Sequence, residues 1–194
     1  MPSVLLTAFE PYDQWEENSS WLAIVELTRW LEDTSHITTR RYPVCFDSVR
    51  KRLAEDLRGN YDLVLHLGQA PGSTHIRLEA VGLNVHANGQ PLVAGAPAAY
   101  RSSLDLSRWQ QQLVQAGIPA QVSQHAGTYL CNATLFLSQH ILAEQKLSSQ
   151  AAFIHLPLTP AQAAREPTML ASMSTPMIAA AIAAMLETHR SIAT

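Results

Sequence analysis

The sequence has little of what several common protein classes need. It has only two cysteines among 194 residues, Cys45 and Cys131, which argues against a disulfide scaffold and against a cysteine-based zinc site. Its eight histidines include no His-Glu-x-x-His pair, so we expect no metal ion and no other cofactor. Lysine and arginine form no block and the net charge is −3, so neither nucleic acid nor an anionic membrane is expected as a partner.

Long apolar runs are also missing. The longest covers residues 177–186, whereas a helix that spans a bilayer needs about 20 apolar residues. The first nine residues lack the basic region of a signal peptide, and Glu10 ends their apolar run early. We therefore expect a cytoplasmic protein, because a reducing compartment suits two unpaired cysteines.

The composition is that of a globular protein, with 47% hydrophobic and 15% charged residues, and its length suits a single domain over residues 1–194. Strand-like and helix-like segments alternate along the chain. This alternation favours an α/β fold in which helices cover both sides of a mainly parallel, twisted sheet, giving a three-layer α/β/α sandwich. In such sheets, ligands bind outside the carboxyl ends of the strands.

Apolar runs and alternating patterns indicate the individual elements. Strands are expected at residues 4–8, 36–42, 63–67, 76–83, 120–124 and 151–156. Helices are expected at residues 18–31, 46–57, 105–116, 131–145 and from 175 onward. Short polar residues are placed to cap three of these helices, namely Asn18 or Ser19, Asp47 and Thr175.

Cys131 lies in the segment Ala-Gly-Thr-Tyr-Leu-Cys-Asn, between an expected strand and an expected helix. The turn at Gly127 places the thiol at the helix N-terminus, where free N–H groups and the helix dipole favour the reactive thiolate and could hold an oxyanion. Cys45 has no glycine turn or helix start directly at its thiol, so Cys131 is the candidate nucleophile. The alternative is a structural cysteine, because free cysteine is among the most buried residues.

His155 and Glu79 could complete a catalytic set. His155 ends an otherwise apolar strand, where a general base is needed and where imidazole has a suitable pKa, although it could also be a core histidine. Glu79 lies within an apolar strand and could orient His155 by accepting its second ring N–H. Alternation along its strand equally allows Glu79 a surface position on an edge strand. Gln69 follows another buried strand, in a loop that either reaches the site or is an ordinary turn.

At these residues the chain resembles the pyroglutamyl peptidase I family of cysteine peptidases, also called pyrrolidone-carboxylate peptidases. The Ala-Gly-Thr-x-x-Cys-Asn block is the most specific part of the resemblance, which covers almost the whole chain. The matching segments, in family order, are residues 7–12, 18–20, 67–70, 126–132 and 153–157.

The resemblance implies that the protein removes N-terminal pyroglutamate from peptides, and that it forms a homo-oligomer, a dimer or a tetramer. It also implies a role for each matching residue. The nucleophile, base and orienting acid are Cys131, His155 and Glu79, respectively. Pocket walls come from Phe9, Tyr12 and Leu130, and the groups that hold the lactam ring come from Asn18 and Gln69. Aromatic walls with one or two amides suit a compact, uncharged ring.

Two departures from the family pattern lie beside the expected pocket. The loop at residues 84–91 is shorter than usual and lacks the family's arginine, and Asp13-Gln14 replaces a common Gly-Gly pair. They motivate two alternatives to a pyroglutamyl peptidase. One is a related cysteine amidase or deamidase that acts on another small amide, and the other is a catalytically weak ligand-binding relative.

Overall fold

The protein is described by a computed structural model that covers residues 2–192. Within that range six strands form one sheet in the order β2-β1-β3-β8-β4-β7, and two more strands form a separate pair, β5-β6. The strands are β1 (Val4–Phe9), β2 (Ile37–Tyr42), β3 (Leu63–Gln69), β4 (Ile76–Glu79), β5 (Val81–Leu83), β6 (Ala99–Arg101), β7 (Ala120–Ser123) and β8 (Gln150–Leu156). The helices are α1 (Ser19–Trp30), α2 (Phe46–Asp56), α3 (Leu106–Gln115), α4 (Leu130–Glu144), α5 (Pro160–Ala163) and α6 (Thr175–Ile192), with a short 3₁₀ helix at Leu57–Gly59.

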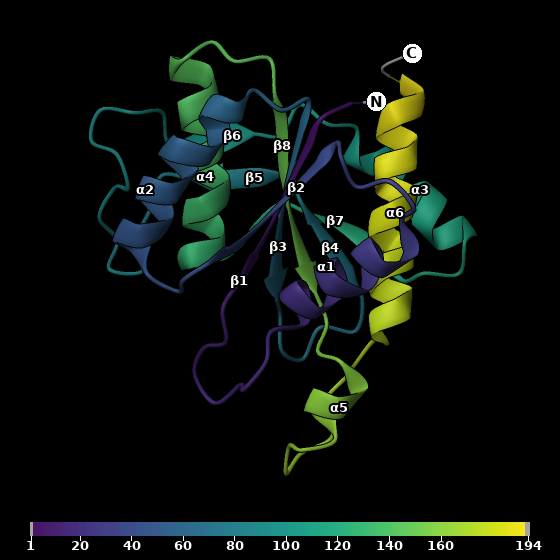
Figure 1. Ribbon diagram of the computed structural model, residues 1–194. Coiled ribbons are helices and arrows are strands. Elements are labelled where there is room, and N and C mark those ends of the chain that lie inside the picture. Colours follow the sequence, from purple (N-terminus) through teal and green to yellow (C-terminus); the bar gives the residue numbers. More distant parts are fainter. Residues whose placement is uncertain (1, 193–194) are drawn as a thin grey trace.

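The predicted three-layer α/β/α architecture with a mainly parallel sheet is confirmed. Strands β2, β1, β3 and β8 run parallel, whereas β4 is antiparallel to β8 and parallel to β7. Helices α2 and α4 cover one face of the sheet, and α1, α3 and α6 cover the other (Figure 1). No helix within residues 2–192 is long and apolar enough to cross a membrane.

Both faces of the central strands are buried, which explains why these strands read as continuous apolar runs. On β1, Leu6 belongs to the core that includes α1 and α6, while the neighbouring Leu5 belongs to a second cluster that includes Leu142 of α4. All three side chains are buried. Successive side chains of a strand point to opposite faces, so one short segment contributes to the hydrophobic cores on both sides of the sheet.

The single strand expected at residues 76–83 is two strands. The chain leaves the main sheet at Ala80, whose N–H donates to Ser123 of β7 while its carbonyl accepts from Ser102 beyond β6. A Cβ atom at Gly82 would lie 2.7 Å from the backbone nitrogen of Phe136 in α4. Strand β5 is therefore pressed against α4, where only glycine fits, and it pairs with β6, a strand that the sequence analysis did not predict.

The helix caps were predicted with mixed success. Asn18 caps α1, because its side chain accepts a hydrogen bond from the N–H of Ser20. Asp47 does not cap α2; it lies in the first turn, where its charge complements the helix dipole. The last helix already includes Thr175, and the Oγ of Ser174 accepts from a backbone N–H in its first turn.

His66 lies in β3 with its imidazole completely buried. The Oγ1 of Thr7 is 2.7 Å from Nδ1, and the Oγ of Ser138 is 2.7 Å from Nε2, so both ring nitrogens have hydroxyl partners. Burial disfavours the charged imidazolium and lowers the pKa of His66 to about 3. The folded protein therefore keeps this ring neutral at pH values where the unfolded chain begins to protonate it.

We expect His66 to make folding stability depend on pH. Below about pH 6.5 the unfolded chain binds a proton that the folded chain does not take up until about pH 3. The free energy of unfolding therefore decreases as the pH is lowered through this range. The slope due to this residue approaches about 1.4 kcal/mol per pH unit. His66→Gln keeps a donor and an acceptor but cannot titrate, so it should flatten the slope. Urea unfolding of both proteins between about pH 7 and pH 4 measures this, and parallel curves would contradict the prediction.

Candidate active site

Cys131 is the second residue of α4, as the sequence predicted. The preceding turn uses Gly127 with a φ of 81°, a conformation that glycine adopts without strain. Tyr129 occupies the cap position and makes no side-chain cap hydrogen bond. The N–H groups of the first turn of α4 are therefore available to an anionic group beside the thiol.

Gly68 allows the thiol to approach the sheet. A Cβ atom at this position would lie 3.3 Å from the Sγ of Cys131 and 2.6 Å from the ring of Phe153. Gly68 is also the register partner of His155 on the adjacent strand β8. The thiol thus lies over β3, directly beside the strand that carries His155, at the carboxyl ends of both strands where the fold class predicts a site.

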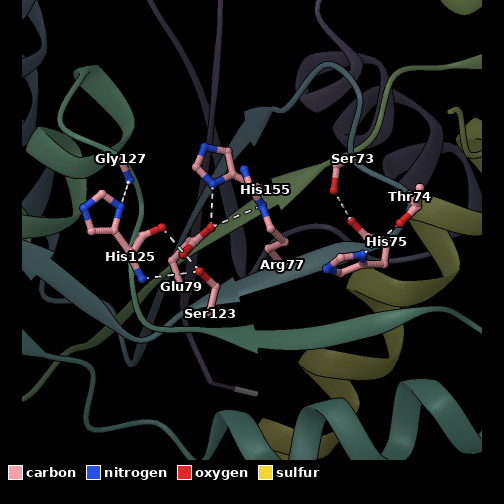
Figure 2. A network of polar contacts seen from close by, with 9 residues as sticks. All are labelled: Ser73, Thr74, His75, Arg77, Glu79, Ser123, His125, Gly127 and His155. Carbon is pink, nitrogen blue, oxygen red and sulfur yellow. Dashed lines mark hydrogen bonds and ion pairs between the residues drawn. The ribbon is translucent and has the colours of Figure 1, made fainter. Parts of the chain in front are cut away.

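His155 and Glu79 form a buried pair. The Nδ1 of His155 is 2.7 Å from the Oε1 of Glu79, and the two side chains point at each other from β8 and β4 (Figure 2). Glu79 is fully buried in a strand that lies between β8 and β7. The alternative of a surface position on an edge strand is therefore wrong. The carboxylate is placed to hold the ring so that Nε2, the other nitrogen, is free to act.

Arg77 adds a positive charge that the sequence analysis did not predict. Its Nε lies 3.6 Å from the Oε1 of Glu79, and it is the register partner of His155 (Figure 2). The Oε2 of Glu79 is buried and has no hydrogen-bond partner among the described residues. The sequence contained a signal for this contact, because Arg77 and Glu79 are two residues apart on one strand and such residues share a face.

Burial raises the pKa of the Cys131 thiol to about 12. The negative charge of Glu79 adds to this effect, while Arg77 and the N–H of Cys131 itself oppose it. This direction is opposite to the one expected from the helix N-terminus, because desolvation makes the largest contribution. The thiol keeps its proton at neutral pH, so a nearby base has to remove it during any reaction.

An open cavity of about 700 Å³ lies beside the start of α4, where Tyr129 lines it; Cys131, His155 and Glu79 do not line it. Tyr12 lines it together with Tyr129 and Cys45, which the sequence analysis did not name as pocket residues. Phe9 and Leu130 are almost fully buried, at 4% and 2% exposed, so they support the site from within the core. The other residues that line the cavity are Glu10, Pro11, Asp13, Pro43 and Val44.

Cys45 is a second thiol at a helix start, which corrects one argument from the sequence. It is exposed and occupies the cap position of α2, although no helix start was expected directly at this thiol. Hydrogen bonds from the side chain and backbone N–H of Ser48 lower the pKa of Cys45. What distinguishes Cys131 is therefore its place beside His155 and Glu79 rather than the helix N-terminus alone.

The two predicted amide side chains are held by hydrogen bonds near the cavity. Gln69 is the last residue of β3 rather than part of a loop, and its Oε1 accepts from the N–H of Ser19 at 2.8 Å and from the Nε2 of Gln162 at 2.7 Å. Asn18 caps α1 with its Oδ1, and its Nδ2 donates to the carbonyl of Glu10. Both amides therefore have fixed orientations.

No group of three His, Cys, Asp or Glu side chains is close enough to hold a metal ion in the part of the chain that the structure describes. The chemistry that the described side chains can support is that of a partly buried thiol, an imidazole fixed by a carboxylate, and backbone N–H donors at a helix start.

Comparison with known proteins gives one family for this chain. The family model described as pyroglutamyl peptidase matches residues 2–191. Pyrrolidone-carboxylate peptidase 1 of Ralstonia nicotianae is 39% identical over 181 residues, which cover 86% of this chain and 83% of the relative. The pyrrolidone-carboxylate peptidase of Thermococcus kodakarensis is 35% identical over 176 residues, 84% of this chain and 85% of the relative.

Solved structures give the same result. The pyrrolidone carboxyl peptidase of Pyrococcus furiosus superposes with a TM-score of 0.90 at 29% identity, over 97% of this chain and 98% of that one. The enzyme of the same name from Fervidobacterium islandicum superposes with a TM-score of 0.89 at 31% identity, over 98% and 99% of the two chains. The likeness therefore extends over the whole fold and includes every segment that carries the site.

Proposed function

The chain belongs to the pyroglutamyl peptidase family, and on this basis we propose that it removes N-terminal pyroglutamate from peptides by thiol catalysis. Cys131 is the nucleophile, His155 the general base and Glu79 the carboxylate that orients it. The observation that carries the proposal is the 2.7 Å contact between His155 Nδ1 and a fully buried Glu79, beside a thiol at a helix start. A carboxylate is rarely buried without such a purpose, because desolvation of its charge is costly.

The reaction follows from these positions. The Nε2 of His155 takes the thiol proton as the Sγ of Cys131 attacks the carbonyl carbon of the peptide bond that follows the pyroglutamyl residue. N–H groups at the start of α4 hold the oxyanion that forms. Collapse of this intermediate breaks the C–N bond, and the imidazolium gives its proton to the departing amine. Water, deprotonated by His155, then cleaves the thioester to release pyroglutamate and restore the thiol. Glu79 stabilises the imidazolium.

The substrate ring is proposed to lie near Tyr12 and Gln69. A lactam is uncharged, so an aromatic wall and an amide donor can hold it without desolvating an ion. Glu10 and Asp13 also line the cavity, and Asp13 is exposed. These two carboxylates put negative charge near the opening and disfavour a substrate whose first side chain ends in a carboxylate.

We expect strong selectivity among matched substrates. The kcat/KM for a pyroglutamyl amide of a fluorophore should exceed that for the prolyl and glutamyl amides by at least ~10²-fold, because both lack the lactam carbonyl and carry charges that lose hydration in the site. Gln69→Ala should narrow the gap between pyroglutamyl and prolyl substrates. Comparable values for all three in the parent protein would favour the cysteine amidase. Lactam binding without hydrolysis would favour the weak ligand-binding relative.

We also propose a cytoplasmic location and a homo-oligomeric assembly, a dimer or a tetramer. Both cysteines are free, and Cys45 is exposed, which suits a reducing compartment. The assembly is proposed from the family resemblance. Light scattering coupled to size-exclusion chromatography measures it directly, and a monomeric mass at micromolar concentration would contradict it.

A further inference from the structure

The carboxamide of Gln69 is held by donors on one side only. Its Oε1 accepts two hydrogen bonds, from the backbone N–H of Ser19 and from the Nε2 of Gln162. Its Nε2 is buried and has no hydrogen-bond partner among the described residues. An unpaired buried donor is costly, so a group that stays unpaired in the free protein is a candidate for pairing with a ligand.

The two neighbours allow only one orientation of this amide. Both are N–H donors, so turning the carboxamide by half a turn would place its NH2 group against two other donors. The NH2 group must therefore point away from Ser19 and Gln162. On that other side lies Tyr12, which lines the cavity. Burial raises the pKa of its phenol to about 12 and the charge of Cys131 adds to this, while the nearby Gln69 amide acts in the opposite direction without a hydrogen bond of normal length.

Gln162 is itself fixed in orientation. Its Oε1 accepts from the N–H of Thr159 at 2.9 Å, and its Nε2 donates both to Gln69 and to the carbonyl of Glu17 at 3.0 Å. Gln162 also completes the capping box that starts the four-residue helix α5. It is 4% exposed, and none of its hydrogen-bond partners among the described residues belongs to the proposed triad. Each polar atom of Gln162 thus has a partner of the opposite kind.

We infer that Gln162 is a positioning residue for substrate specificity, which fixes the polarity of the Gln69 carboxamide so that the cavity presents an N–H donor to the carbonyl oxygen of a lactam ring. The inference rests on the proposed function, because it concerns the ring that the site would hold. The chain of hydrogen bonds runs from Glu17 and Thr159 through Gln162 to Gln69, and it joins the loop before α1 to α5. A ring without the carbonyl gains nothing from this donor.

The test measures binding of 2-pyrrolidone, the bare lactam, by ligand-observed NMR, so it does not depend on hydrolysis. Gln162→Glu keeps the acceptor for Thr159 but removes the donor to Gln69, whose amide is then free to turn its oxygen toward the cavity. We expect the Kd for 2-pyrrolidone to rise roughly five- to tenfold, the value of one neutral hydrogen bond. Gln162→Met, similar in length and uncharged, should give a comparable loss and serves if the glutamate variant does not fold.

Three further variants separate positioning from simple support of α5. If Gln162 acts through Gln69, the variant Gln69→Met should weaken binding by a similar factor, and the double variant with Gln162→Glu should lose nothing more. Thr159→Ala removes the hydroxyl of the capping box and leaves the bond between Gln162 and Gln69, so its Kd should stay within about twofold of the parent. Unchanged binding in both Gln162 variants, losses that multiply in the double variant, or an equal loss in Thr159→Ala would overturn the inference.

Hydrolysis of a pyroglutamyl amide is measured separately on the parent protein. Absence of hydrolysis with the expected pattern of 2-pyrrolidone binding would refute the proposed function and support the role of Gln162. Hydrolysis by the parent protein with unchanged lactam binding in the variants would support the proposed function and refute the role of Gln162. In active protein, Gln162→Glu should raise KM more than it lowers kcat, because the lost contact lies away from the scissile bond.

Discussion

Cys131→Ser is expected to abolish hydrolysis of pyroglutamyl amides, with a loss on the order of 10⁴-fold or more in kcat, whereas Cys45→Ser keeps most of the activity. A serine hydroxyl is a far weaker nucleophile than sulfur, and the site would have to remove its proton in the same buried surroundings. Cys45 lines the cavity, whose lining includes neither His155 nor Glu79. Equal losses in both variants, with folding intact by circular dichroism, would contradict the assignment of Cys131.

Alkylation has to be interpreted with the two thiols in mind. Cys45 is exposed and its pKa is lowered by hydrogen bonds from Ser48, while burial raises the pKa of Cys131 to about 12. Iodoacetamide reacts with the thiolate, so it should modify Cys45 first, and an adduct there can block the cavity without touching the nucleophile. The informative experiment is therefore inactivation of the Cys45→Ser variant, with mass spectrometry to locate the adduct. Full inactivation of that variant without an adduct on Cys131 would exclude the thiol mechanism.

Glu79→Gln is expected to lower kcat by ~10²-fold or more, and His155→Ala by at least as much. Glutamine can still accept the hydrogen bond from Nδ1, but it loses the charge that stabilises the imidazolium. The buried position of Glu79 makes this loss large, because little water reaches the pair to replace it. The double variant should be hardly worse than His155→Ala alone, because the two residues act as one unit.

A control variant and a folding measurement make the prediction for Glu79→Gln specific. Glu144→Gln changes an exposed acid at the far end of α4, so it should leave kcat unchanged. Far-ultraviolet circular dichroism and thermal unfolding show whether each variant is folded, since loss of a buried charge partner can destabilise the chain. Near-normal kcat in a folded Glu79→Gln variant, or effects of Glu79→Gln and His155→Ala that multiply, would remove Glu79 from the site.

Local pattern was enough to predict most of the elements and to single out Cys131, His155 and Glu79 as candidates, with a structural alternative left open for each. Apolar runs with sharp ends predicted the buried strands β1, β3 and β8, and the glycine turn predicted the helix that begins beside Cys131. His155 stood out because a polar ring ends an apolar strand. These features are decided by residues close together in the chain, through periodicity, caps and turns, so a single sequence reveals them.

Other features depend on which segments meet in space, and only the tertiary structure decided them. Alternation allowed Glu79 to be either on a surface or inside, and the place of β4 between β8 and β7 settled that it is inside. The helix N-terminus alone predicts a lowered pKa for the Cys131 thiol, whereas burial in the folded protein raises this pKa. The partners of Gln162, at residues 17 and 69, lie far from it in sequence. Long-range pairing and desolvation leave no local pattern, because they depend on contacts between segments whose sequences are independent of each other.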